Sequence, residues 1–181
     1  MPTLKTFFAY ALIPVLILGT SCVKDIDLDQ ASEIVVSPTA AIDLVYFTIA
    51  LEDFSPTGTT GPKMAGDVVR LEFLDDDYIQ NDLSRADLNF VYYNSFTNPV
   101  RSDLIFLSEG EREQYRISFT IPGGSPAAPG VINYTEIIQG EDLEDFKNSI
   151  KLRVELEMFS GPVQEGGELQ LKSKAFLKFD F

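Results

Sequence analysis

Apolar and polar residues alternate along most of the chain from Ala41 onward, with a period of two. Residues 150–158 have an apolar side chain at every second position, with lysine, arginine or glutamate between them. The C-terminal residues 169–181 follow much the same pattern. Because successive side chains of a β-strand point to opposite faces, each segment is predicted to be a strand with one buried and one solvated face.

Shorter runs of the same kind predict further strands at residues 68–74, 86–96, 102–108 and 113–121. Residues 44–51 are apolar almost throughout. That pattern is typical of a strand buried on both faces or placed at the centre of a sheet. The two segments richest in glycine and proline, 54–67 and 122–130, are predicted to be loops.

One segment favours a short helix. Asp142 can cap it, and Leu143, Phe146 and Ile150 follow at helical spacing. Together these elements predict an all-β fold for residues 38–181: an antiparallel β-sandwich of about eight short strands with one short helix. A signal peptide and a flexible tether are expected to precede this domain.

A second architecture fits the same length. An eight-stranded outer-membrane β-barrel also alternates along its strands and often ends in an aromatic residue, as this chain does at Phe181. The sandwich is favoured because Lys151, Arg153 and Lys172 lie in the middle of predicted strands, where the lipid-facing side of a barrel is apolar. A barrel also needs no lipid anchor, and the N-terminal segment predicts one.

Residues 1–21 are predicted to be a signal peptide. Lys5 precedes an apolar run of 12 residues, 7–18, apart from the hydroxyl of Tyr10. A run of this length suits the core of a secretory signal and is shorter than the ~20 residues of a membrane-spanning helix. Small and polar residues follow, and then Cys22, the only cysteine in the chain.

This arrangement resembles the lipobox of bacterial lipoproteins. In that family the cysteine receives a diacylglyceryl group on its thiol, and cleavage before the cysteine then makes it the new N-terminal residue. Ser21 fits the pattern, whereas Gly19 stands where the family usually has Leu, Val or Ile. The looser form is similar to lipoproteins of the Bacteroidota, and the whole chain loosely resembles their small flavobacterial-type outer-membrane lipoproteins. Two or three acyl chains together would hold the protein stably at a membrane.

Residues 22–37 are expected to be an acidic tether between the lipid and the domain. Lys24 and Asp25 directly after the cysteine resemble the signal that exports Bacteroidota lipoproteins to the outer face of the outer membrane. An acidic linker without any such signal is the alternative interpretation.

Composition narrows the chemistry of the domain. The 181 residues include 28 acidic and 14 basic side chains, and the net charge of −14 argues against nucleic acid as a partner. The chain contains no histidine, so it lacks the commonest general base and the commonest metal ligand. One cysteine cannot form an intrachain disulfide. We therefore expect no enzymatic activity, although paired carboxylates are plentiful.

Two groups of residues are candidate binding sites. The first combines aromatic rings with amides near the end of a predicted strand, as sugar and peptide binders do, and consists of Tyr93, Asn94, Phe96 and Asn98. The second could supply oxygen ligands to Ca²⁺ and consists of Asp75, Asp76, Asp77 and Asp82. The structural alternatives are core packing for the aromatics and a solvated turn for the aspartates.

The expected protein is a lipid-anchored, non-enzymatic binding or accessory module of the outer membrane, facing outward, and a subunit of an outer-membrane complex. The alternative is an independent lipoprotein that binds a glycan, a peptide or calcium. Apart from the covalent lipid on Cys22 and the calcium alternative, we expect no cofactor. The expected partners are the membrane and an outer-membrane protein.

Overall fold

The structure, a computed structural model, describes residues 38–56, 62–161 and 166–181. The chain divides into two units, Met1–Val35 and Val36–Phe181, and every described residue belongs to the second. The signal peptide, the lipidation site Cys22, the export residues Lys24 and Asp25 and the tether all lie outside the described residues.

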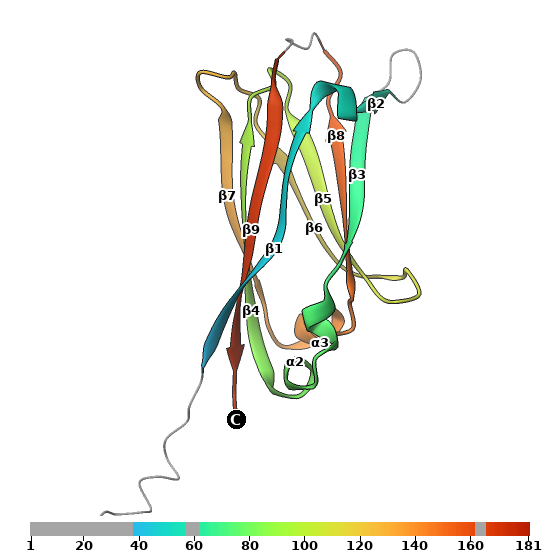
Figure 1. Ribbon diagram of the computed structural model, residues 1–181, viewed down its shortest axis with the longest axis vertical. Helices are drawn as coiled ribbons and strands as arrows, with labels where there is room; N and C mark the ends of the chain where they lie inside the picture. The colour runs from blue at the N-terminus through green and yellow to red at the C-terminus, as the bar shows by residue number, and fades with distance from the viewer. Residues whose placement is uncertain (1–37, 57–61, 162–165) are drawn as a thin grey trace, which may run out of the picture. The chain divides into compact units, whose positions relative to one another are not determined.

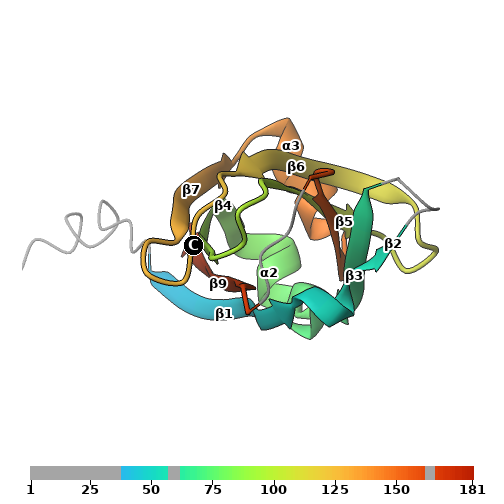
Figure 2. The same ribbon diagram turned by 90° about the horizontal axis from the view of Figure 1, so that it is seen from above.

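The described residues form two antiparallel sheets that face each other (Figures 1 and 2). Sheet A has the order β1 (Thr39–Ala50), β9 (Glu168–Phe179), β4 (Leu83–Asn94) and β7 (Gly130–Ile138). Sheet B has the order β2 (Ser55–Pro56), β3 (Lys63–Arg70), β8 (Lys151–Met158), β5 (Val100–Leu107) and β6 (Glu113–Ile121). The predicted all-β sandwich is therefore confirmed, with eight strands of eight to twelve residues and the two-residue β2 in the described part.

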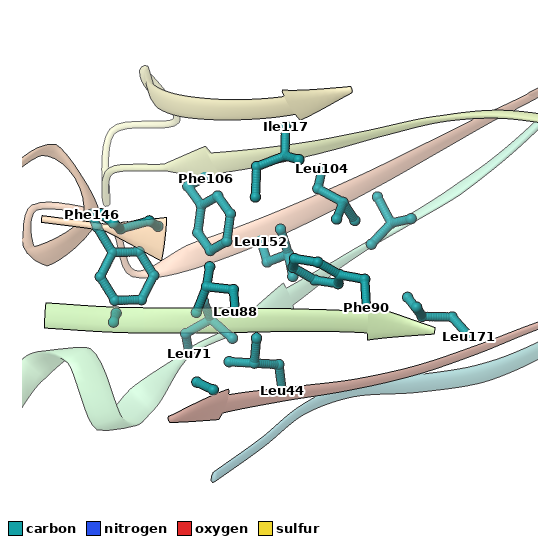
Figure 3. Packing of buried hydrophobic residues seen from close by; sticks show 14 of the residues in the cluster. Leu44, Leu71, Leu88, Phe90, Leu104, Phe106, Ile117, Phe146, Leu152 and Leu171 are labelled. Carbon is teal, nitrogen blue, oxygen red and sulfur yellow. The ribbon is translucent and has the colours of Figure 1, made fainter. Parts of the chain in front are cut away.

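The core lies between the sheets and consists of the apolar side chains of the alternating pattern. Figure 3 shows Leu88 and Phe90 of β4 meeting Leu104 and Phe106 of β5, with Leu152 of β8 beside them. All five side chains are essentially fully buried. Because every second residue of these strands is committed to this core, the remaining residues form the outer face of each sheet.

Two short α-helices lie at the end of the sandwich where β1 begins and β9 ends (Figure 1). Helix α3 (Glu141–Lys147) confirms the predicted helix, and its Phe146 packs edge-to-face on Phe106 with the ring centroids 5.4 Å apart. Helix α2 (Asp77–Asp82) was not predicted. No helix in the described part of the chain is both long and apolar enough to cross a bilayer.

The predicted strand at 68–74 is wrong in its second half. Strand β3 ends at Arg70, and the chain continues into a 3₁₀ turn, η3 (Glu72–Asp75). Its Leu74 and the following Ile79 of α2 are fully buried, so both side chains close the end of the core. Apolar residues that plug the end of a sandwich cannot be told from a strand by periodicity alone.

Residues 44–51 are confirmed as a strand, since β1 covers all but Leu51, but the prediction that this strand is buried on both faces or central in its sheet is wrong. Strand β1 is the edge strand of sheet A, and the side chain of Tyr46 on its outer face is 66% exposed. A β-bulge between Asp43 and Tyr46 shifts the register with β9. The hydroxyl of Ser173 fits into this bulge, accepting from the N–H of Val45 at 2.9 Å and donating to its carbonyl at 2.8 Å. The apolar run therefore forms a bulged edge strand rather than a fully buried strand.

A tyrosine–glutamate–tyrosine clamp joins the two sheets where β6 lies beside β7 (Figure 2). Glu136 of β7 accepts a hydrogen bond from Tyr115 of β6 at 2.6 Å and another from Tyr134. Burial, followed by the hydrogen bond to Glu136, raises the pKa of Tyr115. The hydrogen bond to Glu136 is the main cause that raises the pKa of Tyr134. Both phenols therefore favour their neutral form in the folded protein.

This clamp predicts how stability depends on alkaline pH. A tyrosine whose pKa is raised on folding stabilises the protein fully below the unfolded pKa of about 10, and this contribution is lost as pH rises further. We expect the free energy of unfolding to fall above about pH 10, and to fall less steeply in Glu136→Gln, where the carboxylate that is hydrogen-bonded to both phenols is gone. Buried Tyr92, whose pKa is also raised, contributes equally to both proteins. Urea unfolding from pH 8 to 11 measures the difference, and parallel curves would contradict the clamp.

Candidate functional site

The outer face of sheet A brings together two tyrosines, a lysine and a glutamine from three strands. In the strand register Tyr46 pairs with Lys172, and Tyr93 pairs with Gln170. The ammonium group of Lys172 lies 5.5 Å from the ring centroid of Tyr93, a cation–π contact. The amide of Gln170 donates to the hydroxyl of Tyr46 at 3.2 Å. We call these four residues the tyrosine–lysine face.

Two hollows flank this face. The larger, of about 440 Å³, lies beside the β1 bulge and is lined by Tyr46, Lys172, Lys174 and Asn89 among others. The smaller, of about 250 Å³, lies toward the proline-rich β6–β7 loop and is lined by Tyr93, Gln170 and Pro129 among others. Each hollow therefore has one of the tyrosines in its wall, and the Gln170–Lys172 segment of β9 runs between them.

The two outer faces differ in how their charges are arranged. On sheet B, cations and carboxylates pair with each other: Arg116 with Glu113 at 2.6 Å, Arg101 with Asp103 at 3.2 Å, and Arg153 with Glu111 and Glu155 at 3.7 and 3.9 Å. The cations of sheet B are thus largely neutralised by the protein itself.

On sheet A fewer of the cations form ion pairs with carboxylates. Within the described residues, Lys172 and Lys178 of β9 form no ion pair with a carboxylate. Lys174 lies 3.6 Å from Asp43, but both side chains are more than half exposed, and such a pair contributes little. A chain with a net charge of −14 therefore presents a locally cationic strip along β9.

Of the four residues predicted to bind a ligand, only Tyr93 lies on this face. The other three are buried, and the two asparagine amides bond to backbone groups of the β4–β5 connection and of the segments that follow β6 and β8. Asn94 donates to the carbonyls of Asn98 and Pro122, both at 3.0 Å, and accepts from the N–H of Phe96 at 3.0 Å. Asn98 donates to the carbonyl of Phe159 at 2.9 Å, and Phe96 packs edge-to-face on Phe54. These three residues support the loops and are not available to a surface ligand.

The four aspartates proposed for calcium are not brought together. Asp75 pairs with Arg70 at 2.9 Å, and Asp76 precedes the first turn of α2. Asp77 and Asp82 are the first and last residues of α2. In the described part of the chain, no group of three or more acidic or cysteine side chains is placed to hold a metal ion.

Sequence reasoning missed Tyr46, Gln170, Lys172 and Lys174. Tyr46 was hidden in an apolar run, and the residues of β9 looked like an ordinary solvated face. One signal was available: the outward positions of β8 carry charges of both signs, whereas Lys172, Lys174 and Lys178 of β9 have only Phe176 and no acidic residue between them. Neighbouring exposed charges of one sign on a strand can attract a partner of the opposite sign.

The arrangement offers groups suited to binding. Aromatic rings offer apolar faces, amide and hydroxyl oxygens accept hydrogen bonds, and lysines attract negative charge.

Asn94 yields a prediction about the loops beside the smaller hollow. Asn94→Ala would leave two carbonyls and one N–H without their partner, and each buried unpaired group costs about 1–3 kcal/mol. We expect the free energy of unfolding to fall by roughly 3 kcal/mol, measured by urea denaturation. Asn133→Ala, which removes an exposed amide from β7, is the matched control and should change stability little. Equal stability of the two variants would show that Asn94 does not hold these loops.

No protein-family model and no curated protein matches this chain. The similar solved structures resemble it weakly. A protein of Parabacteroides distasonis predicted to be secreted has a TM-score of 0.48 and 10% identity, over 64% of this chain and 38% of its own. The infectious bursal disease virus VP2 subviral particle has a TM-score of 0.41 and 6% identity, over 80% of this chain and 33% of its own. Tailspike protein 4 of bacteriophage CBA120 has a TM-score of 0.40 and 12% identity, over 76% of this chain and 19% of its own. The chain thus spans well under half the length of each.

Proposed function

We propose that this chain is a lipid-anchored, non-enzymatic binding module of the outer membrane that uses the outer face of sheet A to bind its partner. The observation that carries the proposal is Lys172, which lies between Tyr46 and Tyr93 without a carboxylate partner in the described residues. A cation left unpaired on a strongly acidic protein, between two aromatic side chains, is more useful to a partner than to the fold.

The placement of the hollows supports this proposal. Thr39 pairs with Lys178 at one end of sheet A, and Ala50 pairs with Glu168 at the other. The smaller hollow and the β4–β5 and β6–β7 connections lie at the second end (Figure 1). A chain anchored through Cys22 enters the sandwich at Thr39, so these loops are at the far end of β1 from the point of entry.

The character of the face favours a reversible ligand over a permanent partner. Its centre is mixed, with aromatic, amide and cationic side chains, whereas obligate protein interfaces are broadly apolar. A role as subunit of an outer-membrane complex is the second candidate, and one observation favours it. Val131, Ile137 and Phe176 on the same outer face are 50%, 49% and 39% exposed. We leave calcium binding out of the proposal because the expected aspartates lie apart.

The anchor predicts a simple result. Cys22→Ala should abolish incorporation of a radiolabelled fatty acid and release the chain from membranes, because the thiol is the proposed site of acylation. Metabolic labelling followed by membrane fractionation measures both effects. Ser37→Ala, at the other end of the same segment, is the control and should remain labelled. Labelling that persists in Cys22→Ala would overturn the lipid anchor.

The binding face predicts where a partner can be captured. We would replace Tyr46 or Tyr93 by the photo-crosslinker p-benzoylphenylalanine in the full-length chain and irradiate intact cells. Tyr78 on α2 is the matched control, since it is a half-exposed tyrosine that packs on Phe179 at the end of β9 and is not part of the tyrosine–lysine face. We expect crosslinked adducts from the two face positions and none from Tyr78. Adducts from all three positions alike, or from none, would contradict the proposed binding face.

A further inference from the structure

We propose that the tyrosine–lysine face binds a linear anionic carbohydrate, one whose sugar units carry carboxylate groups. This inference rests on the proposed function, because it names the ligand of the same face. Four features carry it: the charge of β9, the orientation of the amides, the two tyrosines and the paired backbone of the sheet.

The charge of β9 selects a negative ligand. Lys172 and Lys174 are two residues apart on one strand, so both point outward, about 6.6–6.8 Å apart along the strand. Lys172 has no carboxylate within reach in the described part of the chain, and Lys174 has only the exposed Asp43. The rest of the protein is acidic and would repel an anion, so an anionic ligand that binds here is attracted by these lysines specifically.

The amides around the lysines are oriented by the protein. Gln170 directs its N–H groups to the hydroxyls of Tyr46 at 3.2 Å and Thr48 at 3.5 Å. Asn89 directs its own to the side chains of Asn133 at 2.8 Å and Thr135 at 2.9 Å. With their donors engaged, the amide oxygens of Gln170 and Asn89 remain as acceptors on the face. Acceptors held in place in this way suit a ligand with many hydroxyl donors, which is the property of a sugar.

The tyrosines and hollows suit an extended chain of rings. Tyr46 lines the larger hollow and Tyr93 the smaller, with Gln170 and Lys172 between them. A ligand that lies across β9 therefore meets a tyrosine, a cation and a second tyrosine in turn. Aromatic faces pack against the apolar C–H surface of a sugar ring, while Lys172 is placed between them for a carboxylate.

An acidic peptide is the competing ligand, and the sheet disfavours it. Peptides commonly bind a sheet by adding a strand to an exposed edge, where backbone groups are unpaired. At the tyrosine–lysine face β9 is paired on both sides, with β1 and with β4. On β9 itself only side chains are offered, so a ligand that lies across this strand and binds through its own hydroxyls and carboxylates fits better than one that binds through its backbone.

The test compares four polymers on the full-length chain in detergent solution. The probes are alginate and polygalacturonate, which are linear polyuronates; dextran, which is neutral; and poly-L-glutamate, an acidic polypeptide. We expect calorimetric binding of at least one polyuronate that weakens as salt concentration rises, and weaker or absent binding of dextran and poly-L-glutamate. Lys172→Gln should weaken polyuronate binding about tenfold, a change of about 1.4 kcal/mol, because the variant loses the charge that pairs with a carboxylate. Arg153→Gln on sheet B is the control and should leave binding unchanged.

Each other outcome overturns the inference in a recognisable way. Equal binding of dextran would show that the ligand need not be anionic, and equal binding of poly-L-glutamate that it need not be a carbohydrate. Failure of both polyuronates to bind, or equal losses in Lys172→Gln and Arg153→Gln, would remove the carbohydrate site. In all these cases crosslinking from Tyr46 and Tyr93 decides the binding face independently, so a wrong ligand class and a wrong face can be told apart.

Discussion

The burial of alternate side chains between two sheets is the constraint on which everything else in this fold depends. Each long strand commits one of its faces to the shared core, and residues such as Phe90 and Leu152 are fully buried there. Only outer faces, strand edges and loops remain for binding. The chain has no histidine, and its one cysteine, Cys22, precedes the domain. The polar groups on those surfaces are therefore mainly those of tyrosine, amide, carboxylate and lysine side chains. The fold thus limits which side chains are available to any partner before a particular site is considered.

The two outer faces use this freedom differently. On sheet B, arginines and glutamates are interleaved across β5, β6 and β8, and their charges neutralise one another. Exposed pairs of this kind add little stability, but they leave the face without a net attraction for a charged partner. On sheet A, Lys172 faces an aromatic ring rather than a carboxylate. The same strand architecture therefore produces one face whose charges pair with each other and one whose lysine remains available to a partner.

Much of the fold could be predicted from the sequence because it depends on local alternation. Strand β6 occupies the predicted residues 113–121, and β8 and β9 differ from their predictions only at the ends. The errors arise where a residue's surroundings are set by distant parts of the chain. The pattern of residues 44–51 suggests full burial, but the sheet order places β1 at an edge. Strand β7 was not predicted, because its sequence lacks the clear alternation that marks the other strands.

The candidate site was less predictable for the same reason. Tyr46 and Lys172 are separated by more than a hundred residues and meet only through the β1–β9 register. Alternation could place Lys172 on a solvated face, but it could not say which residue lies beside it or that no carboxylate does. The aspartates show the opposite case: Asp75, Asp76 and Asp77 are adjacent in sequence, but one ends a 3₁₀ turn and another begins a helix, and no three acidic side chains in the described residues are placed to hold a metal ion.

The end of β4 shows how a correct region can be predicted with the wrong roles. Tyr93 and Asn94 are neighbours, and because the strand alternates, one must point outward when the other points inward. Tyr93 reaches the tyrosine–lysine face, and Asn94 ties together the carbonyls of Asn98 and Pro122 from two connections. A Cβ at Gly123 would lie 2.1 Å from the carbonyl oxygen of Thr97, so these connections also pack too closely for any larger residue there. The buried members of the predicted group thus hold the strand end in position, and the exposed member can present a preorganised ring to a ligand.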